Sequence, residues 1–112
     1  AHLKNLTKLR FLNLFRTQLG DKGLEQLTKL RQLETLLIGG TQVTDQGLAQ
    51  LKAFQQLRKL SLYDTKISDV GIPHLKGLSS LEVLLLEKSQ VSQEGIKLLQ
   101  QALPNVRFGE PT

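Results

Sequence analysis

Hydroxyl side chains recur along this chain of 112 residues at intervals of 24, at Thr17, Thr41, Thr65 and Ser89. A hydroxyl could act as a phosphate ligand or as a nucleophile, and a nucleophile needs a general base beside it. The only imidazoles are those of His2, near the start of the chain, and His74, beside Pro73. The pattern therefore predicts a chain that is not an enzyme. The hydroxyls are expected to bond the backbone amides of the loops.

Metal and cofactor sites are not expected either. The sequence has no cysteine, and neither its histidines nor its carboxylates have the spacing of metal ligands. Four glycines also recur at intervals of 24, at Gly23, Gly47, Gly71 and Gly95, but they do not form a phosphate-binding G-x-G-x-x-G motif. They are predicted to let a neighbouring segment approach closely, because glycine has no side chain.

The same period of 24 residues runs through most other positions of the chain. Leucine recurs at Leu9, Leu33, Leu57 and Leu81, and again at Leu12, Leu36, Leu60 and Leu84. A fixed period of this length indicates stacked supersecondary units. We predict one domain made of coils at 3–26, 27–50, 51–74 and 75–98, with a C-terminal cap at 99–112.

Two segments resemble leucine-rich repeats. Residues Leu9-Arg10-Phe11-Leu12-Asn13-Leu14-Phe15-Arg16-Thr17 are similar to the L-x-x-L-x-L-x-x-N/C core, with Thr in the last place. Thr41-Gln42-Val43-Thr44-Asp45-Gln46-Gly47-Leu48 is similar to the I-T-D-x-G-L segment of the cysteine-containing subclass and to Thr-bearing repeats of large bacterial proteins. The resemblance implies an α/β fold, a right-handed solenoid with a parallel sheet on its concave side and short helices on its convex side.

The local pattern of each coil agrees with this fold. Residues 9–14 alternate between apolar and variable positions, which is typical of a strand with one buried face. Asp21, Asp45 and Asp69 precede short segments with helical spacing and are predicted to cap those helices, each contributing about 1 kcal/mol. Gln93 takes the same place in the fourth coil, so the last helix is expected to be the loosest.

The two ends of the chain differ in pattern. The sequence contains no Met, and Ala1–Leu9 aligns with the second half of a later helix, so we expect a fragment or C-terminal part of a longer array. The strand at 9–14 would then have an unpaired edge that could support self-association. After Pro104 the alternation of Val106 and Phe108 predicts a capping strand.

Charge and composition narrow the possible partners. The net charge is +5, yet the basic residues are interleaved with Asp and Glu, so neither nucleic acid nor an anionic membrane is expected as a partner. No apolar run approaches the roughly 20 residues of a membrane span. The lack of cysteine and of a visible signal peptide fits a cytoplasmic location without requiring it.

The variable positions of the predicted strands line the open, concave face of the sheet. Arg10, Glu34, Arg58 and Glu82 alternate in sign at one level, which is typical of a cross-strand ladder and equally compatible with ligand binding. Of the aromatic residues, Phe54 and Phe108 fall at core or cap positions, whereas Phe11, Phe15 and Tyr63 point outward. Gly39 and Gly40 would leave a notch beside them.

Exposed apolar side chains with charged neighbours are typical of protein interfaces. We therefore predict a protein partner, and the residues expected to bind it are Phe11, Asn13, Phe15, Arg16, Leu37, Lys59, Tyr63, Asp64, Val83, Leu85 and Glu87. Missing coils or a second copy could instead cover the first strand. The alternatives are a spacer segment without its own ligand and, by the resemblance, a substrate-recognition adaptor.

Overall fold

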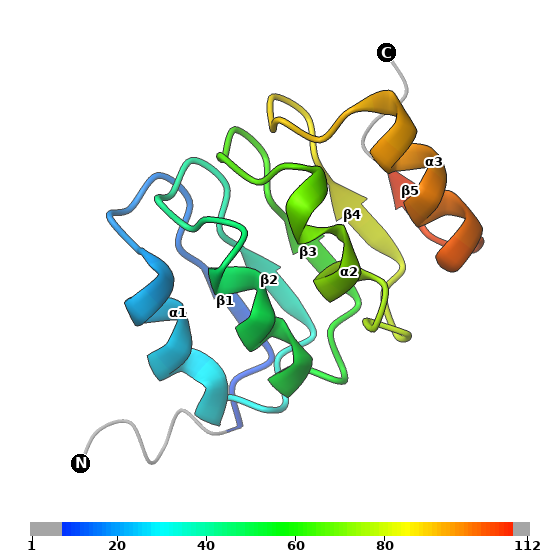
Figure 1. Cartoon of the computed structure of the whole chain (residues 1–112). Helices are drawn as coiled ribbons and strands as arrows, with labels where there is room; N and C mark the ends of the chain where they lie inside the picture. Colours follow the sequence, from blue (N-terminus) through cyan, green and yellow to red (C-terminus); the bar gives the residue numbers. More distant parts are fainter. Residues whose placement is uncertain (1–7, 109–112) are drawn as a thin grey trace.

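The computed structural model describes residues 8–108, and these residues form a short solenoid (Figure 1). Predictions for His2, the first residues of the first coil and the end of the cap lie outside this range. The strands are β1 (Phe11–Asn13), β2 (Thr35–Leu37), β3 (Lys59–Ser61), β4 (Val83–Leu85) and β5 (Arg107–Phe108). The helical segments are α1 (Asp21–Gln26), η2 (Leu27–Lys29), η3 (Gly47–Ala53), η4 (Asp69–Gly71), α2 (Ile72–Leu75) and α3 (Gln93–Ala102).

The five strands form one parallel sheet in the order β1-β2-β3-β4-β5. Leu12 lies opposite Leu36, Leu36 opposite Leu60 and Leu60 opposite Leu84, so each step across the sheet equals one repeat of 24 residues. Parallel neighbours need a long crossover, and each crossover carries a helical segment on one side of the sheet (Figure 1). This is the right-handed solenoid that the resemblance to leucine-rich repeats implied.

A single apolar cluster fills the space between sheet and helices. Leu36, Leu60 and Leu84 are fully buried, and so is Phe54 at the end of η3. Phe108 on β5 packs against the same cluster and is partly buried. The predicted core and cap positions of these two aromatic residues are therefore confirmed.

The hydroxyls at the ends of the strands have structural roles. The Oγ1 of Thr41 donates to the carbonyl of Ile38 at 2.7 Å, and that of Thr65 donates to the carbonyl of Leu62 at 2.7 Å. Both residues are buried. The Oγ1 of Thr17 donates to the carbonyl of Leu14 at 2.8 Å and accepts from the amide of Leu19 at 3.4 Å, and the Oγ of Ser89 accepts from the amide of Val91 at 3.3 Å. The predicted bonds to loop amides are thus confirmed at positions 17 and 89, whereas the hydroxyls at positions 41 and 65 bond a carbonyl instead.

The prediction that the recurring aspartates cap their own helices is wrong. The carboxylate of Asp45 reaches the following coil, where it accepts from the amide of Ser68 at 2.8 Å and from its hydroxyl at 2.6 Å. Asp21 makes the same pair of bonds to Thr44, and Asp69 makes them to Ser92. We call these three pairs the inter-coil rungs. They bind successive coils to one another, a task that a cap within one helix cannot perform.

The helix caps come from the hydroxyl partners of the rungs. The Oγ of Ser68 accepts from the amide of Val70 at the start of η4, and the Oγ of Ser92 accepts from the amide of Gly95 in α3. Because α3 is capped by Ser92 and not by Gln93, the prediction of a weakly capped last helix is wrong. At 10 residues, α3 is the longest helix of the described chain.

Three of the recurring glycines make room for a carboxylate of the preceding coil, so the predicted close approach is confirmed there, whereas a Cβ at Gly23 would meet Leu19 of its own coil. A Cβ at Gly71 would lie 2.7 Å from Oδ1 of Asp45. A Cβ at Gly47 would collide with the carboxylate of Asp21, and one at Gly95 would collide with that of Asp69. Each carboxylate thus occupies the space that a side chain in place of the glycine of the next coil would fill.

Acid is expected to weaken the rung between Asp69 and Ser92. The hydroxyl of Ser92, and then its amide, hold the pKa of the Asp69 carboxyl below the ordinary value of 3.8. A carboxylate with a lowered pKa stabilises the folded state above pH 3.8, and this contribution is lost as the pH falls through the lowered pKa. The protection of the Ser92 amide against hydrogen exchange, relative to its intrinsic exchange rate at each pH, should therefore fall as the pH drops below 3.8 in the natural chain. In the Asp69→Asn variant this protection should depend less on pH. If the variant loses protection in acid as the natural chain does, the prediction is contradicted.

No helix within residues 8–108 is long and apolar enough to cross a membrane.

Candidate functional site

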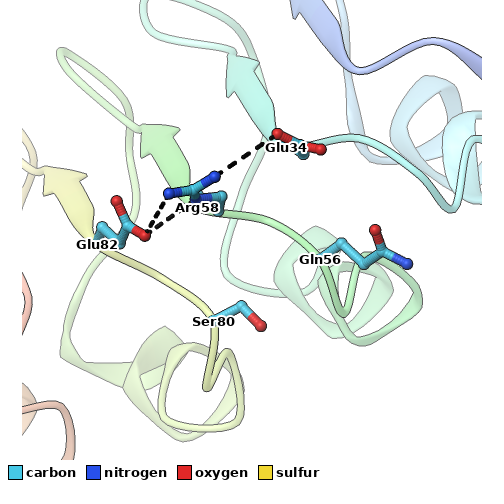
Figure 2. A pocket seen from close by; sticks show the side chains of 5 residues that line it. All are labelled: Glu34, Gln56, Arg58, Ser80 and Glu82. Atoms are coloured by element: carbon cyan, nitrogen blue, oxygen red, sulfur yellow. Dashed lines mark hydrogen bonds and ion pairs between the residues drawn. The ribbon is translucent and has the colours of Figure 1, made fainter.

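The N-terminal ends of the strands carry a ladder of ion pairs. Arg58 lies between two carboxylates, with guanidinium nitrogens 2.9 Å from Oε2 of Glu82 and 4.0 Å from Oε1 of Glu34 (Figure 2). Arg10 extends the ladder, with its Nε 3.8 Å from Oε2 of Glu34. We call these four residues the rim ladder. They confirm the predicted cross-strand pairing.

A polar hollow of about 480 Å³ lies beside the rim ladder (Figure 2). Its lining is formed by Glu34, Gln56, Arg58, Ser80 and Glu82. The charged groups of this lining already bond one another, and the hollow is shallow. It therefore offers little for a small ligand to bind.

The concave face carries the exposed aromatic residues. Phe11 has 57% of its surface exposed and Phe15 has 43%, whereas large hydrophobic residues of the core are below 9%. Leu37, Val83 and Leu85 are half-buried on the neighbouring strands. Apolar surface is thus gathered where side chains point away from the helices.

Phe15 and Tyr63 meet across the strand that separates them. Their ring centroids are 6.3 Å apart, and the rings are tilted by 36°. Between them Gly39 is buried, and a Cβ there would lie 2.8 Å from the carbonyl oxygen of Tyr63 and 3.2 Å from Cδ1 of Phe15. The predicted open notch is therefore wrong, because the two side chains close over the glycine.

Two cations lie against this aromatic pair. The guanidinium carbon of Arg16 is 4.9 Å from the ring centroid of Phe15, and Nζ of Lys88 is 5.8 Å from that of Tyr63. These distances are typical of cation–π contacts. The cations limit the access of a flat ligand to the outer parts of both rings.

The turns after the strands hold their residues in a left-handed backbone conformation. The φ angles are 59° at Arg16, 66° at Gly40, 55° at Asp64 and 61° at Lys88. Only glycine adopts this conformation freely, and other residues bear a cost of about 1–2 kcal/mol. Three of the four coils thus present a charged side chain from a position that would suit glycine better.

The structure brings the predicted site residues onto one face and its C-terminal rim. Phe11, Asn13 and Phe15 lie along β1 and its end, and Oδ1 of Asn13 accepts from the amide of Phe15 at 3.0 Å. The side chains of Lys59, Asp64 and Glu87 are exposed. The sequence-based set omitted Lys88 and also Arg107, which pairs with Val83 in the sheet. Both omitted residues follow from the period, since Lys88 aligns with Asp64 and Arg107 aligns with Val83 at intervals of 24.

Comparisons with known proteins agree with this architecture. A family model described as Leucine Rich repeat matches residues 5–27. An internalin from Listeria monocytogenes has a solved structure that superposes on 98% of the chain with a TM-score of 0.81 and 22% identity. The chain has the fold of a leucine-rich-repeat solenoid. A leucine-rich-repeat protein from Leptospira interrogans also matches, over 96% of the chain, with a TM-score of 0.55 and 17% identity.

A third structural neighbour of this leucine-rich-repeat chain is actin-binding site 2 of leiomodin-1. It matches 97% of the chain with a TM-score of 0.74 and 12% identity. The chain corresponds to 30% of the internalin's length, 39% of the Leptospira protein's and 74% of the leiomodin structure's. A search of curated proteins finds no match to the sequence. Leucine-rich-repeat proteins are generally binding modules without catalytic activity, and protein partners are common among them.

Proposed function

We propose that this leucine-rich-repeat chain recognises a protein partner through its concave face. The observation that carries the proposal is the exposure of Phe11 and Phe15, at 57% and 43%, on the open side of the sheet. Aromatic side chains lose few rotamers on binding and bury a large area, so they dominate many protein interfaces. Tyr63, Leu37 and Leu85 extend the apolar surface over three further strands.

The shape of the surface supports a macromolecular partner over a small molecule. Small-molecule sites are usually enclosed and largely apolar. The hollow at the rim ladder is polar and shallow, and no aromatic side chain lines it. Within residues 8–108 no group of three or more potential metal ligands occurs.

A binding selection tests this proposal. The immobilised chain is used to select binders from a display library of random peptides, and the binders are then titrated against two double variants. Phe11→Ser with Phe15→Ser removes exposed apolar side chains from the concave face. The matched control, Val70→Ser with Leu98→Ser, removes exposed apolar side chains from the helical side, where Val70 is 76% and Leu98 is 47% exposed.

The concave-face variant is expected to lose at least about tenfold in affinity, since each lost anchor costs about 1–2 kcal/mol. The control should change affinity by less than about twofold, because substitutions away from an interface are close to neutral. Circular dichroism establishes that both variants remain folded. Selected binders that tolerate the concave-face variant, or that lose affinity equally with both, would favour the alternative of a spacer segment.

A further inference from the structure

At least five of the ten acidic side chains of this chain bond other residues of the fold. Asp21, Asp45 and Asp69 bind the next coil through the inter-coil rungs. Glu34 and Glu82 accept the arginines of the rim ladder. The ion pairs of this ladder involve Arg10, Glu34, Arg58 and Glu82, and the other basic side chains of the concave face lie outside it.

The concave face consequently has a surplus of positive charge beyond the rim ladder. Four cations lie on it or at its C-terminal rim, and they come from different coils: Arg16, Lys59, Lys88 and Arg107. The two carboxylates in the same region are those of Asp64 and Glu87. Exposed charge of one sign attracts a partner of the opposite sign and accelerates encounter.

The cations lie in two rows across the sheet. Lys59 and Arg107 are level with Phe11, and Arg16 and Lys88 lie five positions further along the repeat. Arg16 follows β1 and Arg107 lies on β5, so the cations span four strand spacings. At about 4.8 Å per spacing this is roughly 19 Å, or about six residues of extended chain at 3.3 Å each. The exposed rings of Phe11 and Phe15 lie at one end of the span, where an apolar side chain of the partner could pack.

We infer that the partner of the concave face is an acidic, extended polypeptide segment that carries apolar side chains. The inference rests on the proposed protein-binding function and specifies its partner. Carboxylates of the segment bind Lys59, Lys88 and the two arginines, while its apolar residues pack against the phenylalanines and Leu37.

A polypeptide accounts for this surface better than a nucleic acid does. Single-stranded nucleic acids bind proteins by stacking bases on open aromatic faces. Here Arg16 lies over Phe15, Lys88 lies over Tyr63, and the two rings also contact each other.

Fluorescence anisotropy with three labelled peptide pools tests the inference. The peptides are about 12 residues long, twice the span estimated from strand spacing. Apolar residues alternate with Asp and Glu in the acidic pool, with Asn and Gln in the amide pool, and with Lys in the basic pool. The acidic pool should bind the full chain at least about tenfold more tightly than the amide pool at about 50 mM salt, and this advantage should shrink at about 500 mM as screening increases.

Charge reversal tests which surface of the chain binds the acidic residues of the peptides. The double variant Lys59→Glu with Lys88→Glu should bind the acidic pool at least about tenfold more weakly and should bind the basic pool more tightly than the natural chain does. The matched control is Lys52→Glu with Lys76→Glu, which makes the same charge change at exposed positions on the helical side. It should weaken the acidic pool by less than about threefold, because screening limits the reach of a distant charge.

The contrary outcomes separate the two proposals. If the amide or basic pool binds best and still requires Phe11 and Phe15, the acidic partner is refuted and the protein-binding face stands. If no pool depends on these two residues, both proposals fail. A single-stranded oligothymidine that displaces the acidic pool and binds more tightly than it does would refute the choice of a polypeptide.

Discussion

Replacing Phe54 by alanine is expected to lower the free energy of unfolding by about 3–5 kcal/mol. Phe54 is fully buried and is the largest side chain in the core. It ends η3, where its amide donates to the carbonyl of Leu51 at 2.9 Å, and its carbonyl accepts from the amide of Leu57 at 3.1 Å. Truncation would leave a cavity between adjacent coils, and a solenoid derives its stability from these contacts.

Urea unfolding followed by circular dichroism measures this effect, and two variants serve as its controls. Phe54→Leu should cost only about 1–2 kcal/mol, because buried leucines at Leu30 and Leu78 occupy the same position of the neighbouring coils. Phe11→Ala removes the same atoms from a side chain that is 57% exposed and should cost less than about 1 kcal/mol. Equal losses for Phe54→Ala and Phe11→Ala would show that Phe54 is not a core residue.

The sheet was predictable from the sequence in detail, and the helical side was not. Strands β2, β3 and β4 each have a buried leucine in the same place of the repeat, so the period determines both the position and the register of Leu36, Leu60 and Leu84. The helical segments share a similar pattern but differ in form. Residues Gly47–Ala53 form a 3-10 helix, whereas Gln93–Ala102 form an α-helix, because packing against neighbouring coils outweighs weak local propensity.

In the candidate site, too, the sequence predicted where residues lie but not which residues they contact. Alternation along β1 predicted correctly that Phe11 and Phe15 face outward. The closure of Phe15 and Tyr63 over Gly39 depends on side-chain conformations across three coils, which no spacing rule contains. The binding role of these residues remains a prediction.

The aspartates show why a correct local rule gave the wrong partner. An Asp just before a helix is a standard cap, and nothing nearby in the chain separates that role from a bond to the next coil. A second set of recurring residues could have predicted the correct partner. Thr44, Ser68 and Ser92 lie 23 residues after Asp21, Asp45 and Asp69. Every aspartate of the series is thus followed by a hydroxyl one coil later, which is a spacing typical of contact between coils.

Replacing Asp45 by alanine is therefore expected to lower the free energy of unfolding by about 2–3 kcal/mol, because hydrogen bonds to a charged group are worth more than neutral ones. Its carboxylate is half-buried and accepts two bonds from Ser68, at 2.8 and 2.6 Å. Its loss leaves the Ser68 amide without this partner at the junction of two central coils. Urea unfolding again provides the measurement, with Glu25→Ala, at an exposed position, as the control for the loss of a negative charge.

A double-mutant cycle with Gly71 distinguishes an inter-coil rung from a helix cap. A Cβ at position 71 would lie 2.7 Å from Oδ1 of Asp45 and 2.6 Å from Cδ1 of Leu48. Gly71→Ala should displace the carboxylate in the natural chain, but in the Asp45→Ala background only the Leu48 contact remains. The cost of Gly71→Ala should then fall by about 1 kcal/mol, which is typical of residues in contact. Additive losses would mean that Asp45 acts within its own coil, since a cap has no reason to couple to a glycine one coil away.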